Sequence, residues 1–341
     1  MFQPHYQISP RLLYTIKRIT ILVHELNKRT PSDLVLMKLQ AEAQAVSTYA
    51  STSIEGNPLP LTEVKRLLKN RPEQIRQSER EVLNYNQVLA KLNAGLDIPF
   101  TKSLLLHIHR SVTQGLLPDH HSGHLRREAV LVRDPRTGDV VYLPPDYDQV
   151  EPLVDNLINF IQSNRKILDP LLLAGIFHKQ LVIIHPFIDG NGRTTRLATN
   201  LLLAGLELNT FNLFSFENYY NQNVTRYFQS VGVFGNYYDL VKMLDFTPWL
   251  EYFAEGILDE LLRVEKELAL RQATPATTLK AHHQLILDYI DEHGFITDKQ
   301  YSQLTERAKA TRTSDFNRLI ELGFIVRQGR GRGIYYQRSA T

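Results

Sequence analysis

The stretch HPFIDGNGRTTR, residues 185–196, determines how the rest of the chain is interpreted. It directly follows the apolar run Pro170–Ile184, and a helix over that run cannot readily continue because the second residue of the stretch is proline. Gly190 and Gly192 allow the backbone to turn tightly before a second helix, which begins at about Asn191. The stretch therefore predicts two helices joined by a polar turn.

The polar residues of this stretch are suited to binding a polyphosphate. The first amides of a helix have no intrahelical acceptor and, together with the helix dipole, attract anions. Arg193 and Arg196 lie at i and i+3 on neighbouring parts of one helix face, where each can bind phosphate through two donors. Asp189 offers a hard oxygen ligand for Mg²⁺, and His185 can titrate near neutral pH as a general base. The combination favours an anion site over a plain helix connection.

The overall composition limits the class of protein. With 341 residues the chain is expected to form two or three units, and its hydrophobic fraction of 43% is enough for real cores. The absence of cysteine excludes disulfides, thiolate nucleophiles and cysteine zinc sites. The N-terminal MFQPHYQISPRLL lacks the apolar core of a signal peptide, and no apolar run is long enough to span a membrane. We therefore expect a soluble, cytoplasmic protein that does not bind membranes.

The segments before the stretch also read mainly as helix, with one exception. Amphipathic spacing predicts helices over Pro10–Asn27, about Asp33–Tyr49, Glu79–Ala94 and Tyr147–Asn164. Ser78, with Glu81 three residues later, reads as a capping box. Residues 129–143, AVLVRDPRTGDVVYL, are two β-branched runs around a turn and predict a β-hairpin. An isolated hairpin is marginal in water, so this one must lie on the helical body or serve as a flap.

The end of the chain has a different character. The small polar stretch ATPATTL, residues 273–279, predicts a linker. Residues 280–341 then read as three helices followed by a strand, a basic glycine turn and a strand, the pattern of a winged helix-turn-helix. The wing arginines are suited to contacting DNA phosphates, although a solvated wing on a protein-contact module explains them equally well; they are Arg327, Arg330 and Arg332. The predicted fold class is mainly α, with a helical core, a β-hairpin flap and a C-terminal winged helix.

The central stretch resembles the signature of Fic proteins, H-x-F-x-D/E-G-N-G-R-x-x-R, with every fixed position filled. The resemblance covers roughly residues 105–245 and implies an all-helical Fic core. It also implies a protein adenylyltransferase, in which a hydroxyl on a Ser, Thr or Tyr of a target protein attacks the α-phosphate of ATP and pyrophosphate leaves. The chain itself is an alternative target for this modification.

The resemblance implies a role for each position of the signature. His185 would be the general base, Phe187 would pack into the core, and Asp189 would hold Mg²⁺. The anion site and the phosphate contacts would come from Gly190, Asn191, Gly192, Arg193 on the β-phosphate side and Arg196 at the γ-phosphate. The segment FENYYNQNVTRYF resembles the helix that closes the nucleotide pocket, through Asn223 and Tyr227.

The hairpin would then be the family's flap, which clamps a target segment by strand-like pairing. The flap residues expected to make this contact are Val130, Leu131 and Val132. The preceding SGHLRR, with Gly123 and Arg126, resembles the segment that leads into the flap.

A second motif lies near the N-terminus. STSIEGN, residues 51–57, reads as a helix end with Gly56 at C′, where the carboxylate of Glu55 faces the negative end of the helix dipole. The segment resembles the Fic inhibitory motif S/T-x-x-x-E-G/N. The resemblance implies that Glu55 pairs with Arg196 and keeps ATP from placing its γ-phosphate. In some family members the same glutamate orients a water for removal of AMP, and the sequence leaves open which role dominates.

These readings predict three regions: an inhibitory N-terminal part, residues 1–104; a Fic core, residues 105–272; and the winged helix after the linker. A function from another class is a DNA-binding regulator whose Fic-like part senses nucleotide. The intact His185 favours an enzyme, because a sensor needs no base. The sequence does not identify the target protein and leaves open whether the protein is a monomer or a homo-oligomer.

The remaining histidines carry weaker hypotheses. Zinc binding is an alternative for five of them, although neither HIHR nor DHHSGH shows the i, i+4 pair that places two ligands on one face of a clear helix: His107, His109, His120, His121 and His124. His178 lies within the apolar run and is expected to be a hydrogen-bonded core histidine.

Overall fold

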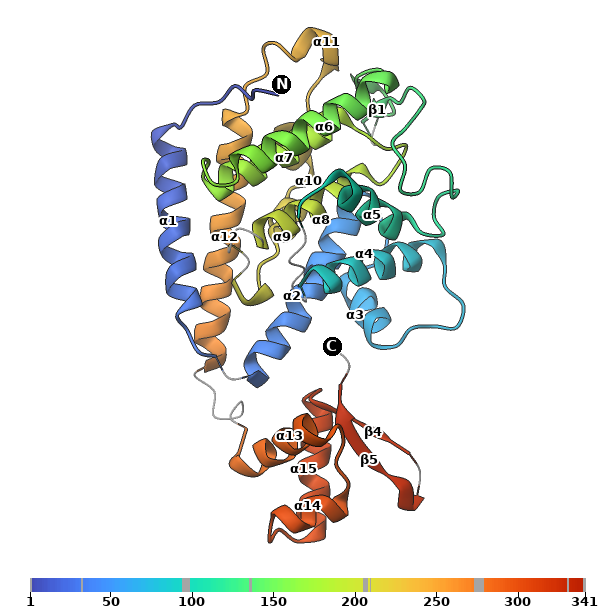
Figure 1. Cartoon of the computed structure of the whole chain (residues 1–341), viewed down its shortest axis with the longest axis vertical. Helices are drawn as coiled ribbons and strands as arrows, with labels where there is room; N and C mark the ends of the chain where they lie inside the picture. The colour runs from blue at the N-terminus through green and yellow to red at the C-terminus, as the bar shows by residue number, and fades with distance from the viewer. Residues whose placement is uncertain are drawn as a thin grey trace. The chain divides into compact units, whose positions relative to one another are not determined.

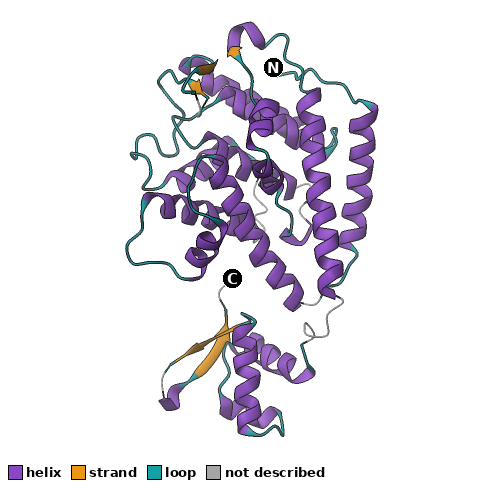
Figure 2. Cartoon of the chain, turned by 180° about the vertical axis from the view of Figure 1, so that it is seen from behind, coloured by secondary structure: helices purple, strands orange, loops and turns teal. Residues whose placement is uncertain are grey.

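The computed structural model describes residues 2–31, 33–93, 99–134, 137–204, 208, 210–272, 279–329 and 331–339 (Figures 1 and 2). The chain forms two compact units: the larger consists of Met1–Arg29 and Gln40–Glu265, and the smaller of Thr30–Leu39 and Lys266–Thr341. Of the three boundaries between the units, one lies between Arg29 and Thr30, and the other two fall within α2 (Asp33–Ile54) and α12 (Thr247–Gln272). Residues 273–278 of the predicted linker lie outside the described residues.

The larger unit is built around α7 (Pro170–Ile184) and α8 (Asn191–Ala204). The side chain of Asp169 caps α7 by accepting from the Leu171 amide, and from Leu171 to Ile184 every residue except Val182 is buried. The remaining helices of this unit are α1 (Pro10–Asn27), α3 (Leu61–Lys69), α4 (Gln77–Asn93), α5 (Lys102–Thr113), α6 (Tyr147–Asn164), α9 (Phe216–Gln222), α10 (Val224–Val231), α11 (Tyr237–Leu240) and the 3₁₀ turn η1 (Thr210–Asn212).

Two long helices lie side by side at one edge of the larger unit, α1 and α12 (Figures 1 and 2). Arg29 forms an ion pair with Glu265 at 3.1 Å, and the hydroxyl of Ser9 donates to Glu251. On its other side α12 approaches α7 closely at Gly175, whose carbonyl accepts from the indole N–H of Trp249 at 2.8 Å.

The structure extends α2 beyond the predicted end at Tyr49, as far as Ile54. Small polar residues are tolerated in this last turn because their hydroxyls find acceptors within the helix: Thr52 Oγ1 donates to the Thr48 carbonyl at 2.9 Å. The turn that follows the helix contains Gly56, which adopts φ +90°, in the region that favours glycine. The segment carrying Glu55 is therefore held at a firm helix end.

The predicted hairpin is present as β1 (Val132–Arg133) and β2 (Val140–Leu143), which pair antiparallel with an irregular register. A short third strand, β3 (Gly235–Asn236), pairs parallel to β2 and was not predicted, because two residues carry no readable pattern. The hydroxyl of Tyr142 donates to the Ile183 carbonyl at 2.9 Å and so anchors β2 to α7.

The predicted capping box of Ser78 and Glu81 is wrong. Because α4 begins at Gln77, Ser78 lies inside the first turn. The amide of Arg76 donates instead to the carboxylate of Glu79 at 2.8 Å, which is one of the two hydrogen bonds of a capping box, placed two residues earlier than predicted. The side chain of Glu81 is therefore available for a tertiary contact.

The smaller unit contains α13 (Ala281–His293), α14 (Asp298–Leu304), α15 (Lys309–Glu321) and the antiparallel pair β4 (Ile325–Gln328) and β5 (Tyr335–Arg338), with the 3₁₀ turn η3 (Gly331–Gly333) between the strands. Its buried core includes Ile286, Leu287, Ile290, Ile296, Tyr301, Phe316, Leu319 and Phe324. This is the element order expected from the sequence, and its assignment as a winged helix stays a prediction. Arg327 is exposed, whereas Arg330 and the side chain of Arg332 lie outside the described part.

Within the described residues, no helix combines the length and apolar character needed to cross a membrane.

Candidate active site

The turn between α7 and α8 is held by its own side chains. Phe187 is fully buried, and the carboxamide of Asn191 makes two bonds to its backbone: Oδ1 accepts from the Phe187 amide at 3.0 Å and Nδ2 donates to the carbonyl at 2.9 Å. The side chain of Asn191 therefore closes the turn, and only its backbone amide remains available for an anion. Gly190 adopts φ +77°, which glycine tolerates without strain.

His109, on α5, contacts the same turn through its imidazole ring. Its Nδ1 accepts from the Gly123 amide at 2.9 Å, so Nε2 carries the proton and donates to the Asp189 carbonyl at 2.9 Å. Its ring stacks on Phe187 with centroids 3.7 Å apart, and burial lowers the pKa of His109 to about 4. Because both ring nitrogens already have protein partners, His109 serves as a support and is not available as a zinc ligand.

The candidate base, His185, caps the end of α7 in a left-handed conformation with φ +50°, which is uncommon for any residue but glycine. Burial lowers the pKa of His185 to about 4; the nearby Arg126 adds to this effect, while Glu55 and Asp189 oppose it. The imidazole is therefore neutral at pH 7 and able to accept a proton.

Arg126 connects this histidine to the flap. Its guanidinium donates to the carbonyls of His185 at 2.8 Å, Glu128 at 3.0 Å and Pro145 at 2.5 Å. Its backbone amide donates to the Pro186 carbonyl at 2.9 Å. Glu128 and Pro145 flank the hairpin on either side. One buried side chain therefore ties the turn between α7 and α8 to both ends of the hairpin.

The second arginine of the stretch, Arg196, is fully buried and meets the predicted inhibitory segment. Its Nη2 donates to Glu55 Oε1 at 2.7 Å and to the Ser51 carbonyl at 2.9 Å, and its Nε donates to Ser51 Oγ at 2.7 Å. Burial alone would lower the pKa of Arg196, but the Glu55 carboxylate and, after it, Tyr227 and Tyr85 act in the opposite direction, and the pKa is raised. The two motifs that the sequence paired are thus in direct contact.

The carboxylate of Glu55 also lies against the beginning of α8. A Cβ added to Gly192 would lie 2.0 Å from Glu55 Oε1, closer than any real contact permits. Only glycine at this position allows the carboxylate to approach the helix N-terminus, where free amides and the dipole favour an anion. Glu55 therefore lies where an oxyanion of a ligand is expected.

The first arginine, Arg193, has a partner that the sequence analysis missed. Its Nη1 pairs with Glu81 Oε1 at 2.5 Å, while Nη2 lies 3.3 Å from Asp189 Oδ2. Among the described residues its Nε, although buried, has no hydrogen-bond partner. The sequence pattern assigned Glu81 to a helix cap, and no local signal places this carboxylate opposite a residue so distant along the chain.

Asp189 carries the carboxylate of this turn, and 58% of its side chain is exposed. Its Oδ1 accepts from the Gly190 amide at 2.6 Å. A single exposed carboxylate beside an anion site fits Mg²⁺, which takes its other ligands from phosphate oxygens and water.

The predicted pocket-closing residues lie near Arg196 but have other partners. Tyr227 is buried, and its hydroxyl accepts from Arg196 at 3.5 Å and lies 3.0 Å from His178 Nε2. His178 bonds Thr199 through its other nitrogen, as expected of a core histidine. Asn223 is exposed and caps α10 by accepting from the Arg226 amide at 3.0 Å. The contacts of Tyr227 and Asn223 with a nucleotide stay predictions.

The predicted flap residues lie before and within β1. Leu131 is exposed, whereas Val130 and Val132 are partly buried. Within the described strands, β2 is paired on both sides, so the outer edges of β1 and of the two-residue strand β3 are the ones with which another strand can pair. The contact of these residues with a target stays a prediction.

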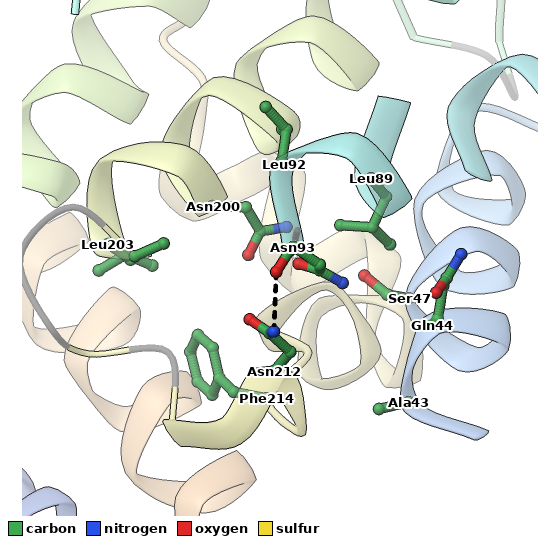
Figure 3. Close-up of a pocket in the computed structure, with 11 residues that line it drawn as sticks. Ala43, Gln44, Ser47, Leu89, Leu92, Asn93, Asn200, Leu203, Asn212 and Phe214 are labelled. Carbon is green, nitrogen blue, oxygen red and sulfur yellow. Dashed lines mark hydrogen bonds between the residues drawn. The ribbon is translucent and has the colours of Figure 1, made fainter. Parts of the chain in front are cut away.

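A pocket elsewhere in the larger unit lies between α2, α4, α8 and the segment after η1 (Figure 3). Asn212 donates across it to the Asn93 carbonyl at 3.0 Å. None of the residues 185–196 lines this pocket, so it is separate from the anion site.

The smaller unit holds another cluster of chemical interest. Among the described residues, His282, His283 and Asp315 are the group whose ligand atoms converge closely enough for a metal ion. The Asp315 carboxylate, however, already accepts two bonds from Arg307, at 2.8 and 3.1 Å, and one from Tyr301 at 2.9 Å. A cation there would face the charge of Arg307, so the cluster reads as a hydrogen-bonded joint between the helices.

The region that contains this turn is similar to known proteins. Residues 99–203 match the model of the Fic/DOC family. The chain is 32% identical to the protein adenylyltransferase Fic of Drosophila erecta over 178 residues, which cover 50% of this chain and 34% of that protein. It is 33% identical to the same enzyme of Drosophila grimshawi, over 53% of this chain and 36% of the relative. The chain thus spans about a third of the length of these curated relatives.

The fold has solved counterparts. A Fic family protein from Desulfovibrio desulfuricans superimposes with a TM-score of 0.67 at 20% identity, covering 100% of this chain and 99% of that one. Residues 134–508 of Fic-1 from C. elegans superimpose with a TM-score of 0.58 at 22% identity, covering 77% of this chain and 74% of that one. The chain therefore carries a domain of the Fic/DOC family, at residues 99–203, which includes the 185–196 signature.

Proposed function

We propose that this protein transfers AMP from ATP to a hydroxyl side chain of a target protein and that Glu55 restrains this activity. His185 takes the proton of the target Ser, Thr or Tyr hydroxyl, whose oxygen then attacks the α-phosphate. The bond to the β-phosphate breaks and pyrophosphate leaves. The amides of Gly190, Asn191 and Gly192 and the guanidinium groups of Arg193 and Arg196 neutralise the phosphate oxygens.

The proposed metal and target contacts use residues at the rim. Asp189 would hold Mg²⁺, which supplies charge neutralisation at the phosphates when bound. The outer edge of β1, with Leu131 exposed beside it, would receive the target segment by strand pairing. The smaller unit is proposed to be a winged helix, on the order of its elements.

The observation that carries the proposal is the position of the Glu55 carboxylate. It bonds Arg196 at 2.7 Å and lies against Gly192 at the start of α8, so it uses both groups that a γ-phosphate would need. A charge-assisted hydrogen bond shielded from water contributes about 1.5–3 kcal/mol. ATP must break this bond or bind with its γ-phosphate displaced, which turns the α-phosphate away from the attacking oxygen.

The test is AMP transfer from labelled ATP, including transfer to the chain itself, by the wild type, Glu55→Gly and Glu55→Gly/His185→Ala. We expect the single variant to be faster by roughly ten- to a hundredfold, since about 1.4 kcal/mol corresponds to a factor of ten. The double variant should be inactive. A single variant without gain would refute the restraint, and a gain that survives loss of His185 would refute the mechanism.

A second candidate reaction uses the same site. Glu55 lies at the start of α8, paired with Arg196, and its charge opposes the effect of burial on the pKa of His185. Together they could orient and deprotonate a water that removes AMP from a modified protein. A modified target that loses AMP with wild type but not with Glu55→Gly would support this reaction.

A further inference from the structure

We propose that Glu81 is a positioning residue that aims one edge of the Arg193 guanidinium at a nucleotide phosphate beyond the α-phosphate. The inference rests on the proposed function, and it concerns a residue outside the signature and outside the inhibitory motif. The inference follows from which nitrogens of the Arg193 guanidinium have hydrogen-bond partners and which nitrogen has none.

The contact between Glu81 and Arg193 is largely shielded from water. Glu81 Oε1 lies 2.5 Å from Nη1, and the two side chains are 17% and 6% exposed. Burial strengthens a charge-assisted bond relative to a surface ion pair. Glu81 therefore holds the guanidinium by one end and prevents its rotation.

The other side of the guanidinium is left for a ligand. The Nε of Arg193 is buried without a partner among the described residues, a costly state unless an acceptor arrives later. The neighbouring Nη2 has only long contacts to Asp189, at 3.3 and 3.4 Å. Nε and Nη2 form one planar edge, which matches two oxygens of a phosphate.

Glu81 is itself held in place. Its Oε2 accepts from the carboxamide of Asn57 at 2.6 Å. Asn57 also donates to the Ser78 carbonyl at 2.9 Å and accepts from the Leu59 amide at 3.1 Å. Because Asn57 follows Glu55 by two positions, the turn that carries the inhibitory carboxylate also fixes the partner of Arg193.

A carboxylate beside a phosphate-binding arginine has two conceivable effects, and they differ in sign. A competitor would occupy the arginine, so neutralising it would tighten nucleotide binding. A positioning residue would orient the arginine, so neutralising it would weaken binding. The state of the Nε–Nη2 edge favours positioning, because Nε has no partner among the described residues, Nη2 has only long contacts to Asp189, and Glu81 engages the nitrogen at the opposite end.

The experiment measures binding of a non-hydrolysable ATP analogue, ADP and AMP by calorimetry, in the Glu55→Gly background so that the restraint is absent. Glu81→Gln should weaken binding of the ATP analogue and of ADP by about tenfold, which corresponds to the loss of one hydrogen bond of about 1.4 kcal/mol. AMP should bind unchanged because it lacks the phosphate that this edge would meet. Glu79→Gln is the matched control, since Glu79 lies on the same helix and pairs with the exposed Arg76.

Each outcome decides the proposal. Unchanged or tighter binding of the ATP analogue by Glu81→Gln would overturn it. An equal loss for all three nucleotides would also overturn it, because general damage to the site does not depend on the second phosphate. If the Glu55→Gly parent bound neither the ATP analogue nor ADP, the proposed function itself would fail. That result differs from one in which the parent binds both nucleotides and Glu81→Gln does not change their affinity.

Discussion

At the scale of single residues, His185 combines a strained backbone with a neutral imidazole. Its left-handed conformation turns the chain out of α7, and burial keeps its pKa at about 4. We expect His185→Ala to lower AMP transfer by about 10²–10⁴, the usual cost of losing a general base. Binding of a non-hydrolysable ATP analogue should stay within about twofold of wild type, since no phosphate contact is assigned to the ring. Equal losses in binding and transfer would argue against a role as base.

Gly192 offers a second test at this scale. Gly192→Ala places a Cβ where the Glu55 carboxylate lies, so Glu55 must move away from Arg196. We therefore expect Glu55→Gly to have little further effect in the Gly192→Ala background, although it has a large effect in wild type. A double-mutant cycle on the affinity for the ATP analogue measures this coupling. Additive effects of the two substitutions would contradict the contact.

At the scale of elements, segments with strong local signals were predictable. The bounds of α6 and α7 agree with the sequence because Asp146–Tyr147 and Asp169–Pro170 open clear apolar patterns. The contact of Glu55 with Arg196 was reached through two motifs, each readable in its own segment. The contact of Glu81 with Arg193 was not predicted, because it depends on which helix faces Arg193 in the folded chain. Strand β3 was missed because its pairing with β2 joins segments that are distant in the sequence.

Arg126 holds both ends of the hairpin, so the predicted role of the hairpin as a flap can be tested through one side chain. Arg126→Gln removes the charge-assisted bonds to the carbonyls of His185, Glu128 and Pro145. We expect AMP transfer to fall at least about tenfold, since these bonds contribute about 1.5–3 kcal/mol each, while affinity for the ATP analogue changes little. Arg127→Gln, at the exposed neighbour, is the control. Loss of nucleotide affinity in Arg126→Gln alone would show that the residue supports the anion site and not the flap.

At the scale of the whole molecule, buried histidines make the larger unit sensitive to acid. Burial lowers the pKa of His109, His178 and His185, to about 4 for the first and the last. At His109 and His185 the unfolded chain therefore takes up protons from about pH 6.5 downward, whereas the folded chain takes them up only near pH 4. Stability should fall across this window, by about 3 kcal/mol for His109 alone. Melting temperatures between pH 4.5 and 7.5 measure the effect, and His109→Gln should flatten the decline; a flat profile in wild type would contradict the burial of these rings.

Each of the two units has a core of its own, which predicts that the larger one survives alone. The core of the smaller unit is formed by its own helices and strands, with Met37 of α2 packed against it. Deleting residues 273–341 should therefore leave the larger unit folded, but it uncovers Met37, an exposed apolar side chain that promotes association. We expect the truncated chain carrying Glu55→Gly to transfer AMP at a rate within about threefold of the full-length Glu55→Gly chain. Adding Met37→Gln should reduce its self-association in sedimentation without changing that rate. If the truncated chain were insoluble both with Met37 and with Met37→Gln, the smaller unit would be needed for the catalytic fold. The same would follow if the truncated chain were inactive under conditions in which the full-length Glu55→Gly chain is active.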